Sequence, residues 1–115
     1  MFNSQISSNA EIDEIVSAIL SAVPAIQIYL FGSHVNGTAT EDSDYDFYVV
    51  IPDDGIRSIE ATRKIREELI GKQSRAIDML VGTQSKFNKY KDTMSFIEGE
   101  VARNGVKLYW RDEML

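Results

Sequence analysis

The 115-residue sequence contains no cysteine and a single histidine, His34. The missing thiols exclude disulfides, zinc–thiolate sites and thiol nucleophiles. One imidazole cannot form a histidine metal cluster by itself. Any bound metal must therefore be held by oxygen ligands, which favours Mg²⁺ or Mn²⁺.

Basic residues are also scarce, with 12 Lys and Arg against 18 Asp and Glu, and the net charge is −6. This balance argues against unspecific nucleic-acid binding, which depends on Lys and Arg contacts to phosphates. No apolar run is long enough to cross a membrane, and the N-terminus lacks a basic region followed by an apolar stretch. We expect one cytoplasmic domain spanning residues 1–115.

Helical and extended patterns alternate along this chain. Ser8 and Glu11 form a capping-box pattern ahead of an amphipathic helix that ends at Pro24. The polar stretch 83–92 shows no apolar stripe. The patterns predict an α/β (α+β) fold in which helices flank a small mixed sheet, with strands at 26–31, 45–51 and 75–81, helices at 56–70 and around 94–105, and a strand or extended segment at 106–110.

Two motifs flank the short crossover between the first two predicted strands. Gly32 and Ser33 follow the first strand, and Asp44 and Asp46 lie at the start of the second. Alternate side chains of a strand share a face, so the two carboxylates are expected to project together and to repel unless a proton or a cation lies between them. A glycine turn leading into a helix could hold an anion such as phosphate. Together these features favour a site for a metal–nucleoside triphosphate.

Asp78 lies inside an apolar stretch that is predicted to form the next strand. Adjacent strands are about 4.8 Å apart, so Asp78 could join Asp44 and Asp46 in a three-carboxylate cluster. Such a cluster can hold two Mg²⁺ ions about 3.5–4 Å apart for in-line phosphoryl transfer.

Structural alternatives exist for each of these residues. Asp44 and Asp46 could form a solvated strand entry, Asp78 could form an ion pair with Arg75 or a lysine, and Ser33 could only cap a helix.

The order Gly32-Ser33, Gly37, Ser43-Asp44-x-Asp46, with Asp78 on a later strand, resembles the nucleotidyltransferase superfamily that includes DNA polymerase beta. Within it, the chain is similar to the minimal nucleotidyltransferases, the antitoxins that pair with HEPN-domain proteins. The residue after Gly-Ser is often Arg or another large basic residue in relatives, whereas this chain has His34.

The resemblance implies the polymerase beta-like nucleotidyltransferase fold and an enzyme that transfers AMP from ATP to a HEPN-domain toxin. Asp44, Asp46 and Asp78 would bind two Mg²⁺ ions, with Mn²⁺ as a possible substitute, while Gly32 and Ser33 would hold the triphosphate. The alternative is an antitoxin that neutralises its partner by binding alone. Base preference, acceptor residue, the number of nucleotides transferred and the oligomeric state have no marker in the sequence.

Overall fold

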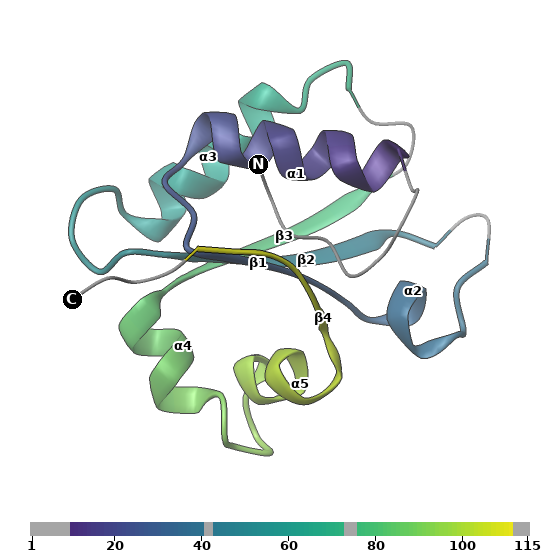
Figure 1. The fold of residues 1–115 in the computed structure, drawn as a ribbon, viewed down its shortest axis with the longest axis vertical. Helices are drawn as coiled ribbons and strands as arrows, with labels where there is room; N and C mark the ends of the chain where they lie inside the picture. The colour runs from purple at the N-terminus through teal and green to yellow at the C-terminus, as the bar shows by residue number, and fades with distance from the viewer. Residues whose placement is uncertain (1–9, 41–42, 73–75, 112–115) are drawn as a thin grey trace.

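Four strands form one mixed sheet in the computed structural model, which describes residues 10–40, 43–72 and 76–111. The spatial order of the strands is β3-β2-β1-β4. β1 pairs antiparallel with β2 and β4, whereas β2 and β3 run parallel. The predicted mixed sheet is thus confirmed (Figure 1), with strands β1 (Gln27–Phe31), β2 (Tyr45–Ile51), β3 (Ile77–Thr83) and β4 (Val106–Trp110).

Helices cover both faces of this sheet (Figure 1). α1 (Ala10–Ala22) and α3 (Ser58–Glu68) lie on one face, and α4 (Gln84–Tyr90) and α5 (Ile97–Asn104) lie on the other. α2 (Ser33–Asn36) is a single turn that follows β1 directly. None of the described helices is long and apolar enough to span a membrane.

The alternation of side chains along β2 divides the apolar interior into two cores. Phe47 and Val49 belong to the core beneath α1 and α3, whereas Tyr48 and Val50 pack with Phe87 of α4 and Val101 of α5. Because alternate residues of a strand share a face, Asp46 projects toward the α4–α5 side of the sheet. The alternation of side chains along β2 therefore places the Asp46 carboxylate, and any chemistry it performs, on the α4–α5 side of the sheet.

Several predicted boundaries shift in the structure. The segment read as a polar connection contains α4, which the sequence concealed because Phe87 is its only buried residue. The helix predicted around 94–105 begins at Ile97, and Met94 is 82% exposed rather than part of the apolar face. The third strand begins at Ile77 instead of 75. The N-cap Ser8 lies outside the described residues.

One buried carboxylate fastens α5 to the sheet. Glu98 is 1% exposed, and its Oε2 accepts a hydrogen bond of 2.7 Å from the Tyr48 hydroxyl. The ammonium of Lys86 lies 3.9 Å from the same oxygen. Burial, together with the hydrogen bond and charge of Glu98, raises the pKa of Tyr48, so its hydroxyl stays protonated and keeps donating.

Replacing Tyr48 with phenylalanine is expected to lower the free energy of unfolding by about 1–3 kcal/mol, because a buried carboxylate loses its donor. Urea denaturation measures this change. Tyr29→Phe is the matched control, since the Tyr29 hydroxyl donates to the partly buried side chain of Gln27 at 3.2 Å. Equal losses in the two variants would contradict a special role for the Tyr48–Glu98 contact.

Candidate functional site

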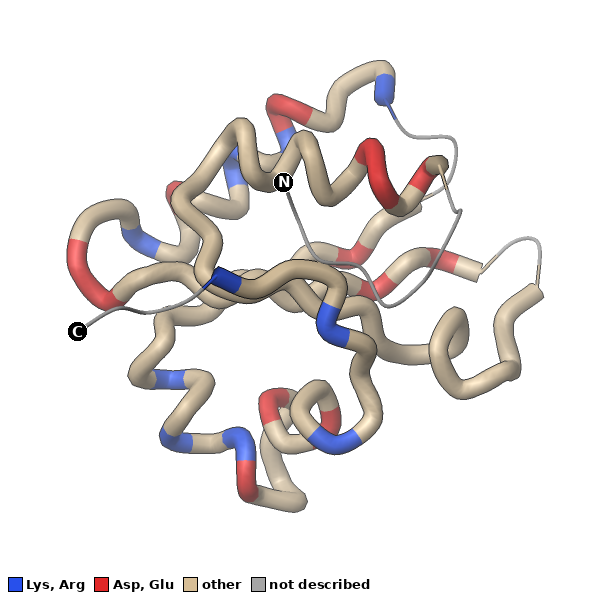
Figure 2. The backbone as a smooth tube through the Cα atoms, viewed as in Figure 1, with Lys and Arg blue, Asp and Glu red and all other residues tan. Residues whose placement is uncertain are grey.

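Two acidic side chains face each other where β2 and β3 begin. Asp46 and Asp78 are register partners in the parallel pair, so their side chains leave the same face of the sheet. The negative charge of each carboxylate therefore acts on its neighbour across the strand pair. Figure 2 shows acidic segments side by side at this end of the sheet.

The pKa of Asp46 is raised above that of an ordinary aspartate. Burial is the largest cause, followed by the hydrogen bond to Asp78 and the negative charges of Asp78 and Asp44, while the nearby His34 acts in the opposite direction. The pair therefore carries unfavourable negative charge when both members are ionised, and a proton or a cation relieves that charge.

Asp44 is less closely involved than the sequence pattern predicts. It precedes β2, is exposed to solvent, and reaches Asp46 through its charge. Within residues 10–40, 43–72 and 76–111, no group of three or more Asp, Glu or His side chains is arranged to hold a metal ion. The structure thus brings two of the three predicted carboxylates into contact, because only Asp46 and Asp78 lie on paired strands.

Asp78 is exposed, although the sequence placed it inside an apolar run. The reason is its position as the second residue of β3, at the open end of the strand. None of the described lysines forms an ion pair with it, and Arg75 lies outside the described residues.

Gly32 lies against the carboxylate of Asp46. It has a φ of 79° and a ψ of −152°, and it occupies the N-cap of α2. A Cβ atom built on Gly32 would collide with Oδ2 of Asp46. Glycine is therefore needed here for its backbone angles and for this close approach. Ser33 is the first residue of α2 rather than its cap, so the capping-only alternative for its side chain is wrong.

His34 has a positioning role that the sequence pattern did not indicate. Its Nε2 lies 3.0 Å from the carbonyl oxygen of Ser43 and donates to it, which fixes Nε2 as a protonated nitrogen. Its ring lies 4.4 Å from the ring of Tyr45, centre to centre. His34 thus ties α2 to the segment that leads into Asp44 and Asp46. No local spacing rule would find a contact between residues nine positions apart.

The donor chemistry of this site fits a divalent cation. The neighbouring carboxylates of Asp46 and Asp78 carry like charge, and a hard cation with oxygen preference could neutralise it. No thiolate ligand competes, because the chain has no cysteine.

The raised pKa of Asp46 predicts a pH-dependent cost to stability. Between the ordinary carboxyl pKa and the raised one, the folded state binds more protons than the unfolded state, so stability falls as pH rises through that window. Asp46→Asn is therefore expected to raise the melting temperature at neutral pH, and this gain should vanish below the ordinary carboxyl pKa. Thermal scans of both proteins from pH 3 to 8 measure the effect. A gain that persists undiminished in acid would contradict the assigned cause.

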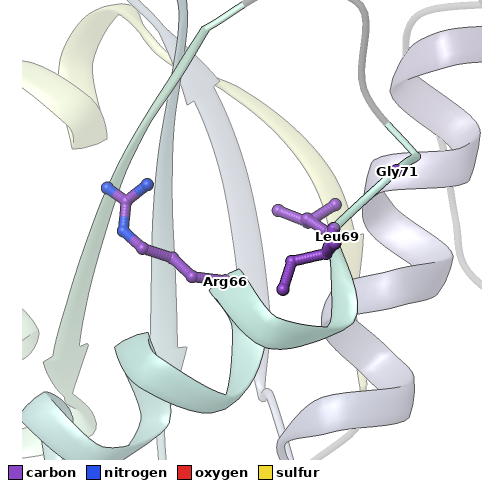
Figure 3. A pocket seen from close by; sticks show the side chains of 4 residues that line it. Arg66, Leu69 and Gly71 are labelled. Atoms are coloured by element: carbon purple, nitrogen blue, oxygen red, sulfur yellow. The ribbon is translucent and has the colours of Figure 1, made fainter.

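Hollows in the described surface lie along α3, on the other side of the sheet. One of about 210 Å³ is lined by Arg66, Leu69, Ile70 and Gly71 (Figure 3). A wider one of about 580 Å³ has Ile59 and Ile70 at its apolar wall. Neither includes a carboxylate of the Asp46–Asp78 pair, so these hollows add nothing to the acidic site.

Comparison with solved structures shows a shared fold. A mutant of the toxin–antitoxin MntA-HpeT is 20% identical, with a TM-score of 0.62, and the match covers 86% of this chain and 73% of that chain. A toxin–antitoxin with AMP-PNP is 21% identical, with a TM-score of 0.57 and the same coverage. A protein from Sulfolobus solfataricus named as a nucleotidyltransferase is 16% identical, with a TM-score of 0.56, and covers 94% of both chains.

The family assignment rests on sequence. No curated protein matches the chain. The model of the nucleotidyltransferase domain matches residues 12–106, a range that contains Gly32, Asp46 and Asp78. With this match, and with its mixed sheet flanked by helices, the chain belongs to the nucleotidyltransferase domain family.

Proposed function

We propose that this protein transfers AMP from ATP to a hydroxyl group of a partner protein and releases pyrophosphate. The observation that carries this proposal is the pair of Asp46 and Asp78 on adjacent strands beside Gly32, in a chain of the nucleotidyltransferase family. In the transfer, the acceptor oxygen bonds to the α-phosphorus of ATP as the bond to the pyrophosphate oxygen breaks. The acceptor proton must leave at the same time.

Asp78 is the residue proposed to take that proton. It is exposed, so an acceptor hydroxyl can approach it from solvent, and it is the register partner of Asp46 on the neighbouring strand. A carboxylate within hydrogen-bond reach of a reacting hydroxyl can act as a general base. Asp46 then carries the negative charge of the pair, next to the backbone of Gly32.

Asp44, Asp46 and Asp78 are the residues proposed to hold Mg²⁺, with Mn²⁺ as a substitute. When bound, the cation would neutralise phosphate charge and polarise the reacting phosphoryl oxygens. The backbone of Gly32 and Ser33 would hold the triphosphate. α2 is only one turn long, so binding there would depend on individual N–H groups rather than on a helix dipole.

The proposed partner is a toxin of the HEPN type. Two structures with this fold are toxin–antitoxin assemblies, one of them with AMP-PNP, an analogue of ATP. The mutant assembly replaces two aspartates, two positions apart, with glutamate. That spacing is the spacing of Asp44 and Asp46 in this chain.

The experiment is a label-transfer assay with ATP labelled at the α-phosphate, Mg²⁺ and, as the proposed partner, the protein encoded by the adjacent reading frame. We expect label on the partner, dependent on Mg²⁺ and lost with EDTA. ATP labelled at the γ-phosphate should leave the partner unlabelled. Label from the γ-phosphate would indicate a kinase and contradict the proposal.

A second candidate function is neutralisation of the partner by binding alone. One observation favours it: in the described part of the chain, no three-ligand group for a metal is assembled. In that case the partner would be inhibited equally well by the wild-type protein and by Asp44→Asn and Asp46→Asn variants, and it would carry no label.

A further inference from the structure

A positively charged and partly apolar surface lies on α4 and the turn that follows it. We call it the α4–α5 surface and define it by Lys86, Lys89, Lys91, Met94 and Phe96. The lysines are solvent-accessible, and Met94 and Phe96 are 82% and 45% exposed. Figure 2 shows the basic residues along α4. Large apolar side chains exposed beside charge are typical of interaction sites.

Neighbouring acids leave much of this positive charge available to a partner. α4 contains two lysines and no acidic residue, and Lys91 follows it directly. Asp92 is the acid in the adjoining turn. Glu98 is buried, accepts a hydrogen bond from Tyr48 and pairs with Lys86 at 3.9 Å, so Lys89 and Lys91 supply most of the available charge. α3 differs, because it carries three basic and three acidic residues, some of them paired, as in the 2.9 Å contact of Arg63 with Glu67.

The turn between α4 and α5 is well fixed. The carbonyl oxygen of Thr93 accepts a hydrogen bond of 2.9 Å from Arg103, and the Thr93 N–H donates to Tyr90 at 3.1 Å. The rings of Tyr90 and Phe96 are stacked with their centres 4.0 Å apart. Met94 and Phe96 are thus presented on an ordered turn, and a surface that is already ordered loses little conformational entropy on binding.

This surface lies on the same side of the sheet as the acidic pair. Asp46 projects toward the face that α4 and α5 cover, and Asp78 is its register partner. Leu80, two residues beyond Asp78 on β3, shares that face and is 40% exposed. Leu80 therefore lies on this face between the acidic pair, near the start of β3, and α4, which follows the other end of that strand.

We propose that the α4–α5 surface docks the partner protein through a segment that carries acidic side chains next to apolar ones. The lysines match the charge of such a segment, and Met94 and Phe96 match its apolar residues. This inference rests on the proposed function, because the docked protein is the acceptor. A partner held there must extend along β3, past Leu80, to bring its acceptor group to Asp78 near the start of that strand.

The test is a calorimetric titration of the partner protein with the complete chain, without nucleotide and at low and high salt. Lys89→Glu combined with Lys91→Glu is expected to weaken binding at least about tenfold and to reduce its salt dependence. Phe96→Ser is expected to weaken binding by a similar factor at both salt concentrations. Circular dichroism and melting curves establish that each variant is folded.

The matched control is Arg57→Glu combined with Arg66→Glu, which makes the same change of charge on the opposite side of the sheet. This control is expected to bind like wild type. The proposal would be overturned if only the Arg57/Arg66 variant bound the partner more weakly, or if both double variants weakened partner binding equally. It would also fail if a single-stranded RNA oligonucleotide bound the surface more tightly than the partner, or if Phe96→Ser dissolved a dimer of this chain.

Label transfer by the wild-type protein is scored separately. If the wild-type protein transfers label and the Lys89/Lys91 variant binds the partner normally, the docking surface is refuted and the proposed function stands. Binding that depends on Lys89 and Lys91, without any label transfer, would support the docking surface and refute the transferase.

Discussion

An Asp78→Asn variant is expected to transfer AMP about 10³-fold more slowly than the wild-type protein, because it lacks both the proposed proton acceptor and a proposed metal ligand. The side chain is exposed, so the substitution leaves the cores intact. The fold should also gain from the loss of a carboxylate beside Asp46. Single-turnover label transfer at saturating ATP measures the rate.

The matched control for Asp78→Asn is Asp54→Asn. Asp54 is also exposed, and it lies in the turn after β2, at the other end of that strand from Asp46. The control removes the same charge without touching the pair, so its rate should equal that of wild type. Partner affinity should be unchanged in both variants. Full activity of Asp78→Asn would exclude the proposed role of the acidic pair.

Gly32→Ala is expected to reduce transfer by about 10²-fold, since an ångström-scale displacement of a reacting group can cost that much. The new Cβ would meet the carboxylate of Asp46 and displace it from its position beside Asp78. The backbone of Gly32, at a φ of 79°, also strains any residue other than glycine. Activity and melting temperature must therefore be measured together.

Gly37→Ala separates these two effects. Gly37 has a φ of 88°, and a Cβ atom there would have nothing within 4 Å. Both variants should lose stability through backbone strain. Gly37 is left-handed helical, so its substitution costs about 1–2 kcal/mol. Gly32, at a ψ of −152°, occupies a region that essentially only glycine adopts, and its substitution costs about 1–3 kcal/mol. Only Gly32→Ala should lose activity beyond that. Equal activities of two equally destabilised variants would show that contact with Asp46 is unimportant.

The strands were the most predictable part of this fold. The run Tyr45–Ile51 is apolar except for Asp46, and the structure confirms this strand at the predicted bounds. α4 escaped prediction because one buried residue, Phe87, leaves no stripe to recognise. Helix ends also differed, since α3 stops at Glu68 while the apolar pattern continues to Ile70.

Contacts within the site divide in the same way. Gly32, Asp46 and Asp78 followed from turn chemistry and strand alternation. Asp44 was predicted to lie beside these carboxylates as closely as they lie beside each other, and the structure does not place it so. β2 begins one residue later, and strand pairing fixes only the residues within the strands. The contact of His34 with Ser43 depends on the path of the whole crossover, which no periodic pattern encodes.

The parallel pairing of β2 with β3 has a consequence for biosynthesis. β1 and β2 are neighbours in sequence and can pair as an antiparallel unit soon after both emerge from the ribosome. Asp46 meets Asp78 only after α3 has carried the chain back across the sheet. A nascent or truncated chain that ends before β3 would consequently lack the acidic pair, so catalytic competence should arrive late in translation.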